Sequence, residues 1–364
     1  MKIGFDAKRA FHNLTGLGNY SRSVINSISD TQPKSKLYLF TTSIKKNIFN
    51  PTNQNIQIIE PRKFINKNYW RLKSVNRELE NLNINIFHGL SNEIPFGINK
   101  KSVVTIHDLL FLKYPKYYNC FDRKIYAFKS KYACEKSSQI IATSNQTKQD
   151  IVNYFNVDEK KIKVIYQSCH NDFIKCEENE KLISELKEEL CAPYILYVGS
   201  IEERKNLLFL LQALSHMKDV KLICVGKKTK YYRKVQEFIF KNNLINRVSF
   251  LNIKDNRKLS LIYQKSRGLI FPSIDEGFGI PIIEAMYSKV PVITSNKSIF
   301  KEIAGANSYF FEQNKLDSLI EEINKIWHDS KDRDDRIKLN LNYVQRFNEK
   351  KQATEIIELY KKLI

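Results

Sequence analysis

The chain has 364 residues, enough for two domains of ordinary size, and its 42% apolar and 12% aromatic residues exclude a disordered chain. It contains no run of about 18 apolar residues, so no transmembrane helix is expected, and its first residues show no signal-peptide pattern. The net charge is +21, and residues 1–175 carry 28 Lys and Arg against 13 Asp and Glu. This charge suits an anionic partner such as a nucleic acid or an acidic membrane surface, and a generally Lys-rich composition is the alternative explanation.

The first half of the chain alternates short β-rich runs with amphipathic stretches of helical period. The expected helices include residues 19–28 and 70–82. The expected strands are 2–7, 36–42, 56–61, 84–89, 102–108, 139–144 and 161–167. Such alternation predicts right-handed βαβ crossovers and a parallel sheet.

The second half repeats this alternation, and a charged helical stretch at 176–190 separates the two series as a predicted linker. The expected strands are 194–200, 220–226, 247–253, 268–273 and 290–296, and the expected helices include 206–217, 234–244 and the tail from about 316. We therefore expect two Rossmann-like domains, 1–175 and 191–345, facing each other across a cleft, followed by a C-terminal helix at 346–364. Ligands bind such sheets at the carboxyl ends of the strands.

The segment EGFGIPIIEAM, residues 276–286, follows the expected strand 268–273. Pro281 suits the first turn of a helix, and Gly277 and Gly279 allow the backbone to approach a ligand closely. The N-terminus of that helix would attract phosphate. Glu276 then lies on the loop and Glu284 about one turn into the helix, either as an acid/base pair or as hydrogen-bond acceptors for a ligand.

A second strand-to-helix segment, YVGSIEERKNL at 197–207, places Arg204 and Lys205 just ahead of a helix with Asn206 as a candidate N-cap. Cations are slightly unfavourable at a helix N-terminus. An anion held between the two side chains would explain their position, although a solvated surface pair is the plainer alternative.

Two further candidates lie in the first half of the chain. The glycine loop TGLGNYSRS, with Gly16 and Gly18, is only part of a dinucleotide-binding fingerprint. In VVTIHDL, His107 lies where a strand would meet the cleft and could donate to a sugar hydroxyl, transfer a proton or be a structural histidine. His88 has a similar position. The six cysteines show no CxxC spacing, so we expect reduced thiols and no zinc site.

The segments YVGSIEERKNL and FPSIDEGFGIPIIEAMYSKVPVITSN resemble the nucleotide-sugar half of the retaining GT-B glycosyltransferases of family four. GFDAKRAFHNLTGLGNYSRS and VVTIHDL resemble its mannosyltransferase-like branch. The resemblance covers nearly the whole chain. One departure is Lys289, which stands where the family usually has a glycine.

The resemblance implies a metal-independent hexosyltransferase without a cofactor and assigns roles to residues. Glu276 would bind hydroxyls of the transferred sugar and Glu284 the ribose, while Arg204 and Lys205 would bind the diphosphate. His107 would lie beside the transferred sugar. The remaining donor-binding positions expected are Gly277, Phe278, Gly279, Ile280, Gly199, Gly226, Gly16 and Gly18. The C-terminal helix would return to the N-terminal domain.

The leaving group decides between the two roles of the glutamates. Glycoside hydrolysis needs a carboxylic acid that protonates a poor leaving group, whereas a nucleoside diphosphate needs only stabilisation of its charge. We therefore expect ligand-holding glutamates. The family resemblance implies a retaining transfer, and the mannosyltransferase-like branch implies mannose from GDP-mannose as the donor, with a UDP-sugar as the alternative.

The expected acceptor is a saccharide, lipid-linked and used in cell-surface polysaccharide synthesis. The basic N-terminal half then suits peripheral binding to the anionic inner face of the cell membrane by a cytoplasmic enzyme. The competing reading is a basic nucleic-acid-binding protein with a vestigial nucleotide site. No RNP pattern, helix-turn-helix signature or aromatic–basic interleaving supports that reading, so we expect no nucleic-acid partner.

Overall fold

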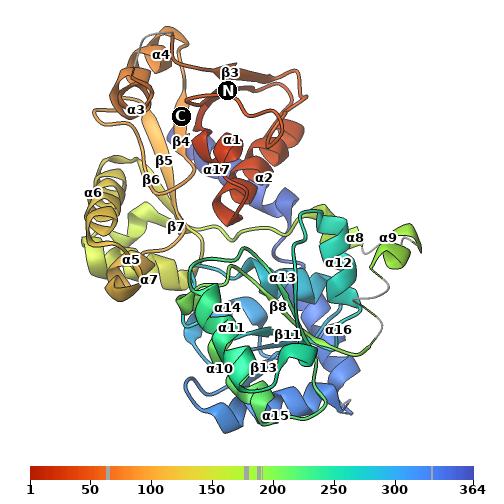
Figure 1. Cartoon of the computed structure of the whole chain (residues 1–364). Helices are drawn as coiled ribbons and strands as arrows, with labels where there is room; N and C mark the ends of the chain where they lie inside the picture. Colours follow the sequence, from red (N-terminus) through yellow and green to blue (C-terminus); the bar gives the residue numbers. More distant parts are fainter. Residues whose placement is uncertain (63–65, 176–179, 187–189, 191, 329–330) are drawn as a thin grey trace. The chain divides into compact units, whose positions relative to one another are not determined.

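The computed structural model describes residues 1–62, 66–175, 180–186, 190, 192–328 and 331–364. These residues form two compact units, Met1–Ser168 with Phe347–Ile364, and Cys169–Arg346. Figure 1 shows that each unit contains a twisted sheet flanked by helices. The predicted α/β class with two Rossmann-like parallel sheets is confirmed, since every strand pair is parallel.

The first unit has a seven-stranded sheet in the order β3-β2-β1-β4-β5-β6-β7. Its strands are β1 (Lys2–Asp6), β2 (Lys36–Phe40), β3 (Ile56–Ile59), β4 (Ile86–Gly89), β5 (Lys101–Ile106), β6 (Gln139–Ala142) and β7 (Ile162–Val164). They are nearly all apolar because helices cover both faces of a parallel sheet. The seven strands expected in this half are therefore confirmed.

The helices of the first unit include one π-helical segment and two 3₁₀ turns. They are α1 (Lys8–His12), α2 (Gly16–Thr31), α3 (Lys67–Tyr69), η1 (Trp70–Ser74), α4 (Val75–Asn81), α5 (Leu110–Lys113), η2 (Pro115–Tyr117), α6 (Cys120–Lys136), α7 (Asn145–Phe155), η3 (Glu159–Lys161) and α17 (Glu349–Leu363). Helix α17 packs against α2, and its Ile356 and Tyr360 are buried in the same core as Ile3 and Phe5 of β1. The C-terminal helix thus returns to the N-terminal sheet, as expected.

The second unit has a six-stranded sheet in the order β10-β9-β8-β11-β12-β13. Its elements are α8 (Asn171–Lys175), α9 (Glu180–Glu185), β8 (Ile195–Val198), η4 (Glu203–Lys205), α10 (Leu207–Ser215), β9 (Leu222–Val225), α11 (Tyr232–Lys241), η5 (Ile245–Arg247), β10 (Val248–Leu251), α12 (Asn256–Gln264), β11 (Gly268–Phe271), α13 (Ile280–Tyr287), β12 (Val292–Ser295), α14 (Ser298–Ala304), β13 (Tyr309–Phe311), α15 (Leu316–Trp327) and α16 (Arg333–Val344). The five expected strands are present. Strand β13, which has three residues, was not predicted. Part of the expected linker 176–190 lies outside the described residues.

The order in which successive strands are added to each sheet reverses at one point. This point lies between β1 and β4 in the first unit and between β8 and β11 in the second. At this point the connections after the two strands run to opposite sides of the sheet. In open parallel sheets, the loops at the carboxyl ends of two such strands separate and leave a crevice between them. In the second unit these are the loops that contain Arg204 and Glu276. The topology therefore places the two sequence motifs side by side.

The expected glycine loop was wrong, and Asn206 was right in position but not in its expected hydrogen bond. Gly16 and Gly18 lie in the first turn of α2 and not in a loop. A Cβ atom on Gly18 would lie 1.8 Å from the carbonyl oxygen of Asn13, so close backbone packing requires glycine there, whereas a Cβ atom on Gly16 meets nothing within 4 Å. Asn206 occupies the N-cap position of α10 with φ 56°, yet its side chain makes no capping hydrogen bond.

Candidate functional site

The loops after β8 and β11 are held together by their backbones. The amide of Ile274 donates to the carbonyl oxygen of Arg204 at 2.9 Å, and the Arg204 guanidinium donates to the carbonyl oxygen of Asp275 at 2.7 Å. This pairing aligns the 3₁₀ turn η4, which carries both cations, with the loop that carries Glu276. Two segments 71 residues apart in sequence thus form one site.

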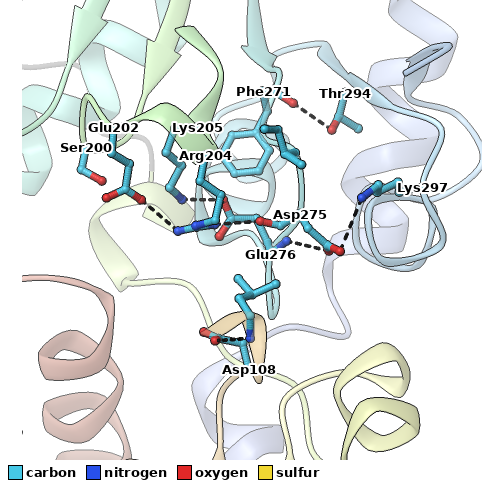
Figure 2. Close-up of polar contacts among 12 residues, drawn as sticks. Asp108, Ser200, Glu202, Arg204, Lys205, Phe271, Asp275, Glu276, Thr294 and Lys297 are labelled. Carbon is cyan, nitrogen blue, oxygen red and sulfur yellow. Dashed lines mark hydrogen bonds and ion pairs between the residues drawn. The ribbon is translucent and has the colours of Figure 1, made fainter. Parts of the chain in front are cut away.

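The carboxylate of Glu276 forms ion pairs with both Arg204 and Lys205. Its carboxylate Oε1 lies 2.6 Å from the Lys205 ammonium and 3.1 Å from the Arg204 guanidinium, and Figure 2 shows the three side chains converging. All three are 11–15% exposed. A second carboxylate, that of Glu202, lies 2.9 Å from the other guanidinium nitrogen. Two positive and two negative charges therefore balance within this cluster.

The charge state of Glu276 follows from this surrounding. Burial raises the pKa of the Glu276 carboxyl, but Lys205 and Arg204 outweigh it and lower the pKa to about 2. Glu276 is thus an anion at any physiological pH. A group that stays ionised accepts hydrogen bonds and cannot act as a general acid.

Helix α13 begins next to this cluster, as the segment FGIP predicted. Its N-cap is Gly279 with φ 113°, a conformation that residues with a side chain rarely adopt, and Pro281 lies in its first turn. Phe278 is buried and holds the loop against the unit. The N–H of Ile280 opens the helix, Pro281 has no N–H, and the N–H of Ile282 donates to the carbonyl oxygen of Gly279 at 3.0 Å. The helix dipole places partial positive charge at this end, which favours an anion.

Glu284 lies in the second turn of α13 and has a different environment. The hydroxyl of Tyr263, on α12, donates to its Oε2 at 2.9 Å. Burial raises the pKa of Glu284 to about 7, and the Tyr263 hydrogen bond opposes this only in part. The two glutamates of the motif therefore differ: one is held ionised by cations and the other titrates near neutrality.

Asp275 and Lys297 support the loop, and sequence reasoning missed them. The amide of Glu276 donates to Asp275 Oδ1 at 2.9 Å, and the Lys297 ammonium lies 3.5 Å from Oδ2 (Figure 2). Asp275 is 1% exposed. Both residues follow adjacent parallel strands, β11 and β12, at their carboxyl ends, and this position was the available signal.

Gly199 and Gly226 end the neighbouring strands β8 and β9. A Cβ atom on Gly226 would lie 1.9 Å from the carbonyl oxygen of Gly199. The close approach of these two backbones gives Gly226 a structural reason to be glycine, independent of any ligand.

His107 lies at the end of β5 in the first unit, in a buried aromatic and polar cluster. Its Nε2 lies 2.9 Å from the carbonyl oxygen of Leu90, and Tyr20 packs edge-on against the ring at 4.6 Å between centroids. Burial lowers the pKa of His107 to about 4, so the ring is neutral. Because a carbonyl can only accept, Nε2 carries the proton and Nδ1 is the acceptor. A donating role for a neutral His107 therefore does not agree with this geometry.

His88, the second histidine candidate, is a structural residue in the interior. Its Nδ1 lies 2.5 Å from the Tyr360 hydroxyl and its Nε2 lies 2.8 Å from the Thr105 hydroxyl. Burial lowers the pKa of His88 to about 3. These hydrogen bonds join the C-terminal helix α17 to β4 and β5.

The described part of the chain offers neither a metal-binding cluster nor a membrane-spanning helix. Within it, no group of three or more His, Cys, Asp and Glu side chains is arranged to hold a metal ion. Nor does any helix there combine the length and apolar character needed to span a bilayer.

Two protein families match this chain. Residues 178–342 match the family described as Glycosyl transferases group 1, and residues 36–169 match the family described as Glycosyltransferase Family 4. The first match contains Arg204, Lys205, Glu276 and Glu284, and the second contains His107.

Individual relatives agree with these families. The sequence is 33% identical over 207 residues to the O-antigen chain mannosyltransferase RfbU of Salmonella typhimurium, covering 56% of this chain and 54% of that protein. It is 26% identical over 384 residues to O-antigen chain mannosyltransferase B of Escherichia coli, covering 100% of both. The chain thus spans about half the length of the first relative and the full length of the second.

A solved structure gives the same fold. The sucrose-phosphate synthase of Thermosynechococcus elongatus matches with a TM-score of 0.82 over 100% of this chain and 99% of that chain, at 19% identity. Such a low identity shows a shared architecture of two Rossmann-like sheets and nothing about the substrate.

Proposed function

Because the chain belongs to the group 1, or family 4, glycosyltransferases, we propose that it transfers a mannosyl residue from GDP-mannose to a saccharide acceptor with retention of configuration. The mannosyl donor rests on the names of the relatives, which are O-antigen chain mannosyltransferases. A UDP-sugar would use the same site and is the alternative outcome of the donor screen below.

The observation that carries the proposal is the ion cluster of Arg204, Lys205 and Glu276 beside the start of α13. A bound nucleotide diphosphate would accept charge-assisted hydrogen bonds from the two cations and a hydrogen bond from the N–H of Ile280 at the positive end of the helix. Negative charge develops on this diphosphate as the glycosidic bond breaks, so fixed cations stabilise the transition state more than the ground state. They would do so without a metal ion.

The reaction would proceed by front-side displacement. The bond between the anomeric carbon and the diphosphate oxygen breaks, the acceptor hydroxyl oxygen bonds to the same carbon, and its proton passes to the departing phosphate. Glu276 would hold hydroxyls of the sugar as a permanent acceptor. Its carboxylate is a weak nucleophile because two cations share its charge. A covalent sugar adduct on Glu276 would contradict this mechanism.

Different pKa values for Glu276 and Glu284 would also suit a glycosidase acid and base. We assign Glu284 instead to the ribose hydroxyls, which would donate to its ionised form. His107 would contribute its Nδ1 as a hydrogen-bond acceptor beside the transferred sugar.

The expected acceptor substrate is a lipid-linked saccharide on the cytoplasmic face of a membrane, which the positive N-terminal half would approach favourably.

A thermal-shift screen against GDP, UDP, ADP and their sugar conjugates tests the donor. A nucleotide at 100 times its Kd adds about 2.7 kcal/mol to the free energy of unfolding. We expect a shift with GDP and GDP-mannose. A shift with UDP and its sugars alone would replace mannose and keep the site, whereas no shift with any nucleotide would contradict the proposal.

Matched variants localise the effect. Arg204→Ala should remove the GDP shift, while Arg233→Ala, which removes an arginine 87% exposed on α11 of the same unit, should retain it. Loss in both variants would mean that the shift reports general charge and no specific site. The anomeric configuration of the product, read by NMR, tests retention.

A further inference from the structure

Helix α6 of the first unit has two apolar faces, and the fold accounts for only one of them. Ser130, Ala133 and Cys134 are buried, the last two in the core beneath β5 and β6. On the solvent side, Phe121 is 78%, Ile125 50% and Phe128 63% exposed. A surface helix normally keeps its apolar residues on the face toward the core. On this second face the Phe128 ring contacts Phe96 at 5.9 Å between centroids, yet most of the apolar surface stays exposed and can meet a partner.

The exposed residues form a continuous strip. Phe121, Ile125 and Phe128 are spaced at i, i+4 and i+7, which places them one above the other along one side of the helix. Tyr126, 43% exposed, lies on another side of the helix, where its ring contacts Phe111 at 6.0 Å between centroids. We call Phe121, Ile125 and Phe128 the α6 strip.

Cations surround the α6 strip. Lys124 is three residues from Phe121 and four from Phe128, and Lys131 is three residues beyond Phe128; both lysines are exposed. Seven Lys and Arg against two acidic residues lie between positions 113 and 136. Just before the helix, the Lys116 ammonium lies 4.9 Å from the ring centre of Tyr117. This segment does interleave aromatic and basic residues, contrary to the expectation from the sequence, and exposed aromatic residues beside lysine are typical of a bilayer interface.

We propose that the α6 strip and its flanking lysines dock the protein on an anionic lipid bilayer. The aromatic and aliphatic side chains would enter the boundary between headgroups and acyl chains while the lysine ammonium groups remain among the lipid phosphates. Some of these cations have carboxylate partners, since Lys129 lies 3.0 Å from Glu93 and Lys131 lies 3.8 Å from Glu135. The charge still favours a lipid surface because the seven cations outnumber the carboxylates around them. The inference deepens the proposed function, since a lipid-linked acceptor is met at such a surface, but it does not depend on the identity of the donor.

The two components make separable contributions. A cation near an anionic membrane strengthens binding about fivefold. The apolar strip acts on any lipid, but by itself gives only weak association. Loss of either component should therefore weaken binding strongly.

The test is cosedimentation of the full chain with vesicles of phosphatidylcholine alone or with an equimolar share of phosphatidylglycerol, at low salt. We expect wild type to favour the anionic vesicles. Changing the α6 strip to glutamine (Phe121→Gln, Ile125→Gln, Phe128→Gln) should lower the partition coefficient at least tenfold. Lys124→Gln with Lys131→Gln should lower it by about the square of the single-cation effect, or roughly 25-fold.

Control variants carry equal changes in the second unit. The exposed residues Phe240 (74%), Ile245 (59%) and Leu339 (50%), changed together to glutamine, match the strip, and Lys221→Gln with Lys241→Gln matches the lysine pair. Both controls should bind vesicles like wild type. Equal urea midpoints for all variants would show that α6 still folds.

Several results would overturn the inference. They are equal wild-type recovery with neutral and anionic vesicles, unchanged binding by the strip variant, or a strip variant that alters only self-association in sedimentation velocity. The GDP-mannose thermal shift is measured without vesicles. It therefore distinguishes failure of the docking surface from failure of the donor site.

Discussion

Removing the charge of Glu276 is the most direct probe of the ion cluster. In Glu276→Gln, Lys205 loses the carboxylate at 2.6 Å and Arg204 loses the one at 3.1 Å, so two cations that are 14–15% exposed are left close together. The fall of the pKa of Glu276 from 4.5 to about 2 corresponds to about 3 kcal/mol of native-state stabilisation at neutral pH, at about 1.4 kcal/mol per unit. We expect a loss of this order in urea unfolding, or roughly 1 M in midpoint for a slope of about 3 kcal/mol/M.

The sign of the pH dependence is fixed by the lowered pKa. The stabilisation is present above pH 4.5 and lost as the pH falls toward 2, because protonation of the native carboxyl abolishes the ion pairs. The difference between wild type and Glu276→Gln should therefore shrink over this range. Glu237→Gln, which removes an ion pair whose partners are 87% and 67% exposed, is the control and should cost at most about 0.5 kcal/mol.

Glu276→Gln should bind inorganic pyrophosphate more tightly than the wild type. In the wild type, the Glu276 carboxylate at about 5 Å would repel one charge of the pyrophosphate by roughly 3 kcal/mol at an effective dielectric constant of 20. Its removal should therefore raise the affinity, measured by calorimetry, tenfold or more. Sugar transfer should fall at the same time, since the acceptor of the sugar hydroxyls is weakened. An unchanged urea midpoint together with unchanged pyrophosphate affinity would refute the cluster as described.

Three further predictions follow from single residues. If ribose binds ionised Glu284, whose pKa is about 7, calorimetry should find GDP-mannose bound about tenfold more tightly at pH 8 than at pH 6, and Glu284→Gln should remove this dependence; a variant that keeps it would contradict the assignment. Lys289 follows α13 with φ 58°, so Lys289→Gly should raise the free energy of unfolding by about 0.5–1 kcal/mol in urea, and a loss would contradict strain there. Gly18→Ala should cost about 1–3 kcal/mol because its Cβ would overlap Asn13, while Gly16→Ala should be neutral or stabilising by up to about 1 kcal/mol; equal costs would contradict the packing of α2.

The sequence alone determined the fold class and the chemical character of the second unit. Strands of a covered parallel sheet are continuous apolar runs and helices repeat every 3.6 residues, so both periods can be read without tertiary information. The FGIP turn into α13 was also local, since Pro281 and Gly279 have conformational preferences of their own. Strand β13 was not predicted, although β7, which also has three residues, was.

Only the tertiary structure decided how these residues act on one another. The pairing of Glu276 with Lys205 joins positions 71 apart, and it exists because β8 and β11 are neighbours where the sheet order reverses. The opposite pKa values of Glu276 and Glu284 depend on which charges and hydroxyls lie within a few ångströms after folding. Gly16 and Gly18 looked alike in sequence, yet only Gly18 meets the backbone of Asn13. Local conformational preference can be read from neighbouring residues in the chain. Burial, charge pairing and close contact depend on which residues lie near one another after folding.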